Sequence, residues 1–102
     1  MKLTYPTSLV LQALARGSHH GFDIMDATGL PSGTVYPILR RLDGEGLVAS
    51  RWEKQTDAQK AQRPPRRYYR LTADGEAVLV QARDRYRALE DVRPAAARAR
   101  TS

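Results

Sequence analysis

The sequence of 102 residues contains no cysteine. Disulfide bonds, thiolate zinc sites, iron–sulfur clusters and cysteine nucleophiles are therefore excluded. Long hydrophobic runs are also missing, because no apolar segment approaches the roughly 18 residues that a membrane-spanning helix needs. Residues 1–17 have a short apolar run broken by Gln12 and no cleavage-site pattern. This segment is typical of the first helix of a cytoplasmic protein rather than of a signal peptide, and no contact with a membrane is expected.

Residues suited to catalysis or to cofactor binding are scarce. His19 and His20 are the only histidines, and two adjacent histidines without cysteine do not form a typical metal site. We find no nucleophile beside a base, no glycine-rich phosphate loop and no converging pair of carboxylates. We therefore expect a protein that is not an enzyme and that uses neither a metal nor another cofactor.

Positive charge is concentrated in one short block. The net charge of the chain is +6. Residues 1–53 carry five cations and five anions, and residues 71–102 carry six cations and five anions. Residues 54–70, by contrast, carry six cations against Asp57 alone, a local charge of +5. A short basic block on a nearly neutral body indicates contact with a polyanion, the alternative being an ordinary solvated loop.

The apolar spacing predicts three helices in the first half of the chain. The first covers residues 7–16, with Thr7 or Ser8 as its cap, and only Gln12 and Arg16 mark a polar side. Such a helix has more apolar surface than one small core hides, so we expect it to contact a second subunit as well. The second helix ends at Gly29, and its expected core residues are Phe22, Ile24 and Met25.

The third predicted helix, residues 33–45, has a proline close to its start. Its apolar residues Val35, Ile38, Leu39 and Leu42 form a one-sided stripe. Proline has no amide hydrogen, so Pro37 costs no hydrogen bond only within the first helical turn. We therefore expect the helix to start at Gly33 or Thr34, or to have a distorted first turn.

A β-hairpin and a last helix are predicted after Gly46. Residues 47–53 and 67–72 have the composition of two antiparallel strands. The segment between them, residues 54–66, is polar and basic and contains two prolines, so we expect an extended, mobile loop. Trp52 is expected in the core, and at most one of Tyr68 and Tyr69 should face inward. The last helix, capped by Thr72, has apolar residues at heptad spacing.

This order of elements predicts a winged helix-turn-helix. The expected fold is mainly α with a small β-hairpin (α+β), in the order α-α-α-β-wing-β-α, and we call residues 54–67 the wing. We expect a DNA-binding domain over residues 1–72, a C-terminal dimerisation helix over residues 73–93 and a flexible tail over residues 94–102. The predicted dimer interface consists of Leu11, Leu79, Ala82, Tyr86 and Leu89.

The side of the third helix that faces away from its apolar stripe suits DNA. In a helix-turn-helix the second helix lies in the major groove, where arginine can bind guanine and threonine or tyrosine can reach phosphate. Wing cations would contact the backbone or the minor groove. The expected DNA-binding residues are Ser32, Gly33, Thr34, Tyr36, Pro37, Arg40 and Arg41 in the helix, and Lys60, Arg63, Arg66 and Arg67 in the wing. The alternative for the helix is an ordinary core helix with a solvated arginine pair.

Several motifs in this order resemble one known family. The segments HGFDI, GLPSGTVYPILRRLDGEGLV, SRWE and RPPRRYYRLTADG are similar to those of the PadR family of bacterial transcriptional regulators, over roughly residues 5–80. The resemblance implies a homodimeric winged-helix repressor with Ser32, Thr34, Tyr36, Pro37 and Arg40 at the DNA. It implies dimerisation through the helix after the wing, often helped by the first helix.

The resemblance also implies that a small-molecule effector is possible, since some family members bind aromatic or multidrug-like ligands at the dimer interface. The long wing and the short C-terminal helix depart from the family pattern, so any such cavity would be small and no effector is assigned. Our leading hypothesis is a repressor that binds double-stranded DNA as a dimer at a palindromic operator. The alternatives are a winged-helix module that binds an acidic protein or RNA, and a multidrug sensor.

Overall fold

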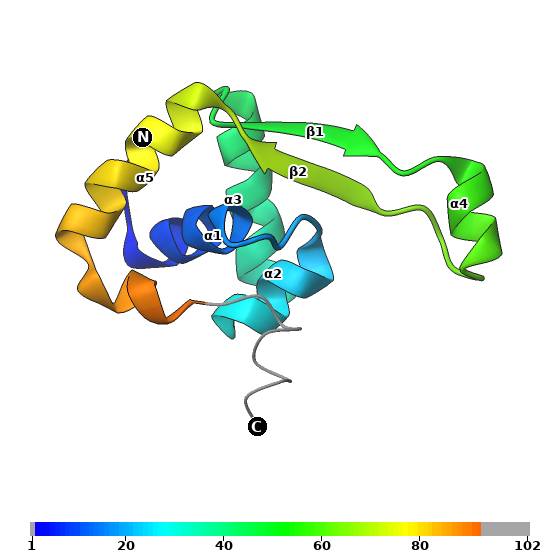
Figure 1. Cartoon of the computed structure of the whole chain (residues 1–102), viewed down its shortest axis with the longest axis horizontal. Coiled ribbons are helices and arrows are strands. Elements are labelled where there is room, and N and C mark those ends of the chain that lie inside the picture. Colours follow the sequence, from blue (N-terminus) through cyan, green and yellow to red (C-terminus); the bar gives the residue numbers. More distant parts are fainter. Residues whose placement is uncertain (1, 93–102) are drawn as a thin grey trace.

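The computed structural model of the chain describes residues 2–92 (Figure 1). The prediction of a mainly helical fold with one small antiparallel hairpin is confirmed. The predicted tail, residues 94–102, lies outside the described residues. None of the helices within residues 2–92 is long and apolar enough to cross a membrane. The elements are α1 (Tyr5–Ala15), α2 (Gly21–Thr28), α3 (Ser32–Gly44), β1 (Val48–Trp52), α4 (Gln55–Lys60), β2 (Arg67–Leu71), α5 (Ala73–Arg85) and a 3-10 helix, η1 (Arg87–Asp91).

Helix α1 lies at the centre and contacts α2, α3, β2, α5 and η1 (Figure 1). It begins two residues earlier than predicted because the Thr4 hydroxyl caps it by accepting from the amide of Thr7. The prediction that Gln12 marks a polar side was wrong, since this side chain is fully buried. Its Nε2 donates to the carbonyl of Leu89 and its Oε1 accepts from Nε of Arg83, both at 3.0 Å. Gln12 is tolerated in the core because both ends of its amide have partners.

Helix α3 buries its predicted apolar stripe but starts earlier than expected. Val35, Ile38, Leu39 and Leu42 are all buried. The helix begins at Ser32 rather than at Gly33 or Thr34, which makes Pro37 its sixth residue. The hydrogen bond that residue 37 would donate to the carbonyl of Gly33 is therefore missing. The structure has the case in which Pro37 costs one hydrogen bond, and not the later helix start that we expected.

The hairpin projects from the helical body and ends in α4 (Figure 1). Its strands pair antiparallel, with Ser50 opposite Tyr69 and Trp52 opposite Arg67. The prediction of an extended loop between the strands was wrong, because residues 55–60 form a helix. That helix has Asp57 in its first turn and Lys60 in its last, as the helix dipole favours.

The C-terminal segment is not the single helix that was predicted. Helix α5 ends at Arg85, and Tyr86 is extended (φ −130°, ψ 98°). The chain then turns back as η1, which contacts α1. Four of the five residues predicted at a dimer interface are buried within one chain, and the fifth, Tyr86, is half-buried. The four are Leu11, Leu79, Ala82 and Leu89. Their contact with a second chain stays a prediction.

Candidate nucleic-acid interface

Helices α2 and α3 form a helix-turn-helix whose turn is held by local hydrogen bonds. Gly29 ends α2 in a left-handed conformation (φ 74°), which glycine adopts without strain, and its amide donates to the carbonyl of Met25. The Thr28 hydroxyl donates to the carbonyl of Ile24 and accepts from the amide of Leu30. These bonds fix the direction in which the chain enters α3.

The polar side of α3 is exposed along its length. Within the predicted DNA-binding set, Thr34 is half-buried, and the other helix residues are exposed: Ser32, Gly33, Tyr36, Pro37, Arg40 and Arg41. Tyr36 and Arg40 line a shallow pocket together with Arg67 of the hairpin. The fold therefore brings Arg40 of α3 close to Arg67 at the end of the wing. The neighbouring Arg41 does not line this pocket.

A glycine at the start of α2 leaves the space that the Tyr36 side chain occupies. A Cβ atom at Gly21 would collide with the hydroxyl and the ring of Tyr36. Only glycine lets the two helices approach this closely at that point. The position of the Tyr36 ring on the exposed side of α3 thus depends on a residue of the preceding helix.

The hairpin is tied to α3 by a polar network around Asp43. The hydroxyl of Ser50 donates to Oδ2 of Asp43 at 3.0 Å. Nη2 of Arg67 donates to the Ser50 hydroxyl at 2.7 Å and lies 3.7 Å from the same Asp43 oxygen. The guanidinium of Arg67 also lies 5.1 Å from the ring centroid of Trp52. These contacts hold the base of the wing at a fixed position relative to α3.

Glu53 closes the base of the wing. Its carboxylate accepts two hydrogen bonds from Arg63, one of them at 2.8 Å, one from the Tyr68 hydroxyl at 3.0 Å and one from the backbone amide of Arg66 at 3.3 Å. The hydrogen bonds from Arg63 are the main reason that the pKa of Glu53 falls to about 2. We call Glu53, Arg63, Tyr68 and the Arg66 amide the wing clasp.

The wing clasp predicts a pH dependence. Because the pKa of Glu53 is lower in the folded chain than its usual 4.5, the stabilisation is fully present above pH 4.5 and is lost as the pH falls towards 2. We expect the protection of the Arg66 amide against hydrogen exchange, taken relative to the intrinsic exchange rate at each pH, to fall several-fold over this range, and Glu53→Gln to lower this protection already at pH 7. Hydrogen-exchange NMR measures both. In Glu45→Gln, a control at the exposed end of α3, wild-type exchange is expected; equal effects of the two substitutions would refute the clasp.

The predicted wing cations differ in what they contact. Arg63 is held by Glu53, and Arg67 by Ser50 and Asp43. Lys60 is exposed at the end of α4. Within residues 2–92, the guanidinium of Arg66 has neither a hydrogen bond nor an ion pair, although its amide belongs to the wing clasp. Lys60 and Arg66 are therefore the predicted wing cations that are open to an external anion.

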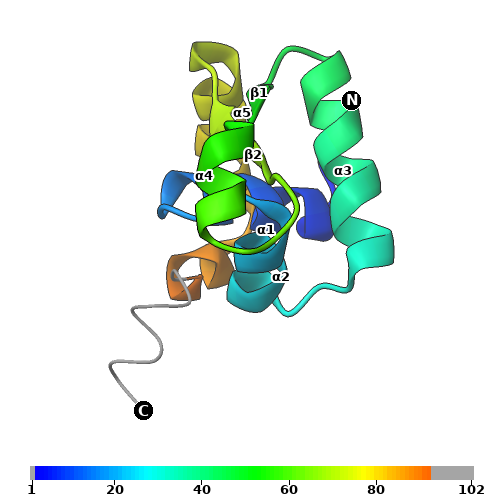
Figure 2. The ribbon, with the colours of Figure 1, turned by 90° about the vertical axis from the view of Figure 1, so that its right-hand side faces the viewer.

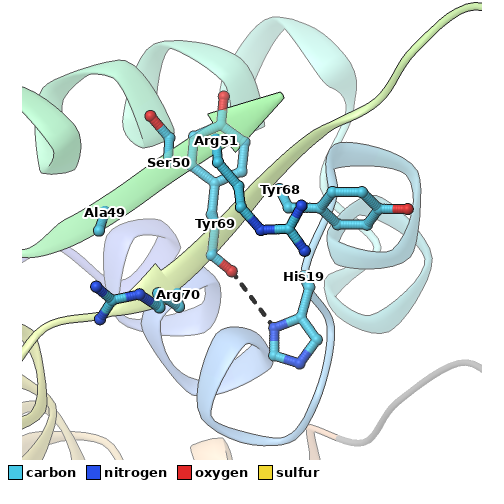
Figure 3. A pocket seen from close by; sticks show the side chains of 7 residues that line it. All are labelled: His19, Ala49, Ser50, Arg51, Tyr68, Tyr69 and Arg70. Atoms are coloured by element: carbon cyan, nitrogen blue, oxygen red, sulfur yellow. Dashed lines mark hydrogen bonds between the residues drawn. The ribbon is translucent and has the colours of Figure 1, made fainter. Parts of the chain in front are cut away.

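The other face of the hairpin carries further cations (Figure 3). A groove of about 630 Å³ is lined there by His19, Arg51, Tyr68 and Arg70, among others. Arg51 lies 4.9 Å from the centroid of the Tyr68 ring, and Nδ1 of His19 lies 3.3 Å from the carbonyl oxygen of Tyr69. Arg51 and Arg70 alternate along the strands with the residues that face α3, so they point away from it.

Two aromatic residues that sequence analysis had not placed in the candidate site line a second cleft. Phe22 and Trp52 were expected in the core, but both are exposed, and this expectation was wrong. They line a cleft of about 430 Å³ between α2, α3 and the wing, which we call the aromatic cleft. Its other lining residues include His20, Tyr36 and Arg66. Of the two adjacent tyrosines only Tyr69 is buried, which agrees with the prediction that at most one of them faces inward.

The titratable groups of residues 2–92 form no cluster suited to a metal ion. No group of three His, Asp or Glu side chains within the described part of the chain is placed to hold a metal ion. Nε2 of His20 lies 3.2 Å from Asp23, yet burial lowers the pKa of His20, which favours the neutral ring at pH 7. What the site offers instead is a set of guanidinium, hydroxyl and aromatic groups on exposed surface.

The same fold occurs in solved structures of transcription regulators. A PadR family transcription regulator from Clostridium difficile R20291 is 24% identical, with a TM-score of 0.69, over 87% of this chain and 94% of that one. A padr family transcriptional regulator from Eggerthella lenta DSM 2243 is 30% identical, with a TM-score of 0.60, over 82% and 76%. Bordetella bronchiseptica BpsR, whose DNA binding is regulated by 6-hydroxynicotinic acid, is 27% identical, with a TM-score of 0.63. The match with BpsR covers 78% of this chain and 56% of BpsR.

Comparison with curated proteins gave no match. A sequence model of the transcriptional regulator PadR-like family, however, matches residues 10–81. That match covers more than half of the chain, and it includes α2, α3 and the whole hairpin. The chain thus belongs to the PadR-like family of transcriptional regulators and is a DNA-binding regulator with a winged helix-turn-helix fold.

Proposed function

We propose that the chain is a sequence-specific repressor that binds double-stranded DNA through α3 and the wing. The observation that carries this proposal is the placement of the exposed side of α3 and the basic wing on one side of the molecule. Tyr36 lines the aromatic cleft with Arg66, and Tyr36 and Arg40 line the neighbouring pocket with Arg67. Figure 2 shows α3 on one side of the hairpin and α5 on the other.

In this proposal α3 enters the major groove and each part of the site has a separate role. Arg40 contacts a base edge, while Ser32, Gly33 and Thr34 lie at the helix start, where main-chain amides and a hydroxyl can bind phosphate. Lys60 and Arg66 contact the backbone or the minor groove. Arg63 and Arg67 act by holding the wing in place, because their guanidinium groups already have partners in the chain.

We propose further that residues 1–72 form the DNA-binding unit and that the segment from residue 73 onwards supports a homodimer. A dimer would place two copies of α3 on a palindromic operator, one helical turn of DNA apart. Two large side chains remain exposed, Tyr5 at the start of α1 (39% exposed) and Val80 on α5 (57% exposed). The Tyr5 ring contacts Tyr86 edge-on, with 5.1 Å between centroids. Exposed side chains such as these are available for contact with a second chain, whereas the four buried residues of the predicted interface already pack within one chain.

The test of the proposed function is a gel-shift titration with the DNA upstream of the chain's own gene. We expect binding that a random duplex does not displace. Affinity should fall with salt by about 0.9 in log–log slope for each phosphate neutralised. Equal binding to random duplex would exclude a specific repressor and favour a general polyanion-binding module, which an RNA or acidic-protein competitor would then identify. By analogy with BpsR, we also propose that a small molecule regulates the DNA binding of this chain.

Displacing Tyr36 should weaken DNA binding without unfolding the chain. In Gly21→Ala the new methyl group collides with Tyr36, an exposed ring that is free to rotate away. If the Tyr36 hydroxyl binds phosphate, the loss of that bond lowers affinity by about 3- to 10-fold. Fluorescence anisotropy with labelled operator measures the change. Gly44→Ala, at the end of α3 with open space around the added carbon, is the control and should bind as wild type does. Wild-type affinity in Gly21→Ala would contradict the role of Tyr36.

A further inference from the structure

Two arginines on the hairpin face that points away from α3 have no acidic partner within residues 2–92. Arg51 of β1 and Arg70 of β2 are both exposed, and in this part of the chain neither guanidinium forms a hydrogen bond or an ion pair. Arg51 packs against the Tyr68 ring instead, 4.9 Å from its centroid. Both positive charges are therefore open to an external anion.

The same two arginines lie close together on the sheet. The register places Arg70 opposite Ala49 and Arg51 opposite Tyr68, so the arginines are diagonal neighbours on one face, with backbones about 7–8 Å apart. Together with His19 they line the groove of about 630 Å³ described above, which we call the outer groove (Figure 3). The described residues that line the outer groove include neither Asp nor Glu.

The base of the wing shows the opposite arrangement of charge. There Arg63 is bound by Glu53, and Arg67 lies beside Asp43. Like charges on neighbouring strands are unfavourable, and the outer groove holds two of them without a carboxylate between them. An external anion with several charges would relieve this repulsion, whereas a purely structural role gives no reason for it.

We propose that the outer groove binds the phosphate backbone of a second DNA duplex, so that the regulator can join two duplexes. Duplex DNA carries one negative charge for about every 1.7 Å of its axis, and a guanidinium binds phosphate through two parallel hydrogen bonds. Because Arg51 and Arg70 point away from α3, a duplex bound by α3 and the wing does not reach them. Contacts with phosphate alone make this second site independent of DNA sequence.

Duplex capture tests whether the chain holds two duplexes at once. Operator DNA, which presents a site to each α3 of the proposed dimer, is immobilised through biotin and saturated with the chain. A labelled random duplex is then added, and the amount retained is measured at rising salt. We expect retention at low salt that disappears at high salt, because phosphate contacts release counterions. If no more labelled duplex is retained with the chain than without it, the proposal is wrong.

Variants with a single arginine replaced locate the contact. Arg51→Gln and Arg70→Gln should each weaken capture of the random duplex about 3- to 10-fold and reduce its salt slope by about one, with operator binding unchanged. Arg87→Gln, at the exposed start of η1, removes the same charge elsewhere and should capture as wild type does. Equal losses in the three variants would assign the effect to net charge and refute the outer groove.

Two further measurements exclude indirect effects. Arg70 also lines a neighbouring groove with Val80 of the proposed dimer surface, so sedimentation of Arg70→Gln checks the oligomeric state. Arg51 does not line that groove, which keeps Arg51→Gln independent of the dimer. Labelled poly-L-glutamate replaces the random duplex in a parallel capture. If it is retained through Arg51 while the duplex is not, the partner is an acidic protein and the proposal is overturned.

The first duplex rests on the proposed function, whereas the affinity of the outer groove for DNA does not. If the chain shows no preference for its operator but still joins two duplexes through Arg51 and Arg70, the proposed function fails and the outer groove stands. If the chain binds its operator specifically and retains no second duplex, the inference about the outer groove alone fails.

Discussion

Leu89→Ala is expected to destabilise the chain by about 2–5 kcal/mol, the usual range for a buried leucine. Leu89 is fully buried, and its carbonyl accepts the hydrogen bond from Gln12. Truncating the side chain leaves a cavity between η1 and the rest of the core and loosens the segment that satisfies the Gln12 amide. Urea denaturation followed by circular dichroism measures the loss, at several protein concentrations so that dimer dissociation is separated from unfolding.

Val80→Ala is the matched control for Leu89→Ala. Val80 lies on α5 and is 57% exposed, so its truncation should change the stability of the folded chain by less than about 0.5 kcal/mol. If Val80 contributes to a dimer interface, the substitution should instead make the apparent stability depend more strongly on protein concentration. A Leu89→Ala variant as stable as Val80→Ala would show that η1 does not pack on α1 in solution.

The three helices in the first half of the chain were predictable because each carries its own periodic pattern. The stripe of Val35, Ile38, Leu39 and Leu42 faces the core as its spacing indicated. The hairpin followed from a change to strand composition on both sides of a polar segment, and the strands differ from the prediction by no more than one residue at each end. These features depend on neighbours in the sequence, which a single sequence contains in full.

Several features that sequence reasoning missed depend on distant partners. Gln12 looks like a surface residue until Leu89 and Arg83 supply its hydrogen bonds. The heptad spacing after residue 79 predicted one long helix, but burial of Leu89 against the chain's own core favours a break at Tyr86. In the same way, Glu53 is an unremarkable strand residue until the chain returns with Arg63 and Tyr68.

The exposed side of α3 and the basic wing of the candidate site were predictable, but which cations are paired within the chain was not. The excess charge of the wing pointed to a polyanion, yet charge alone did not distinguish Arg63 and Arg67, which hold the wing, from Lys60 and Arg66. Trp52 and Phe22 were expected in the core because large apolar side chains usually are. Their exposure beside Arg66 is a property of the tertiary arrangement.

The two adjacent arginines of α3 should respond differently to truncation. Arg40 lies one helical turn after Tyr36 and shares a pocket with it and with Arg67, on the side of α3 that faces the wing. Arg41 follows in the last turn of the helix and is exposed, about 100° further round the helix axis. If α3 enters the major groove on the side of Tyr36, Arg40 is placed to reach a base edge, and Arg41 is placed to reach phosphate.

Arg40→Ala is therefore expected to cost about 1–3 kcal/mol on operator DNA, roughly 5- to 150-fold in affinity, and much less on a random duplex. Arg41→Ala should weaken binding to both duplexes by a similar factor and reduce the salt slope by about one. Anisotropy titrations of both variants on both duplexes, each at two salt concentrations, separate the two roles. Both arginines are exposed neighbours on α3, so neither substitution should unfold the chain. A different dependence on DNA sequence in the two variants would therefore reflect different contacts with DNA. If Arg40→Ala loses the same affinity on both duplexes, Arg40 contacts phosphate. The residues that recognise the base sequence would then lie at the start of α3 or in the wing.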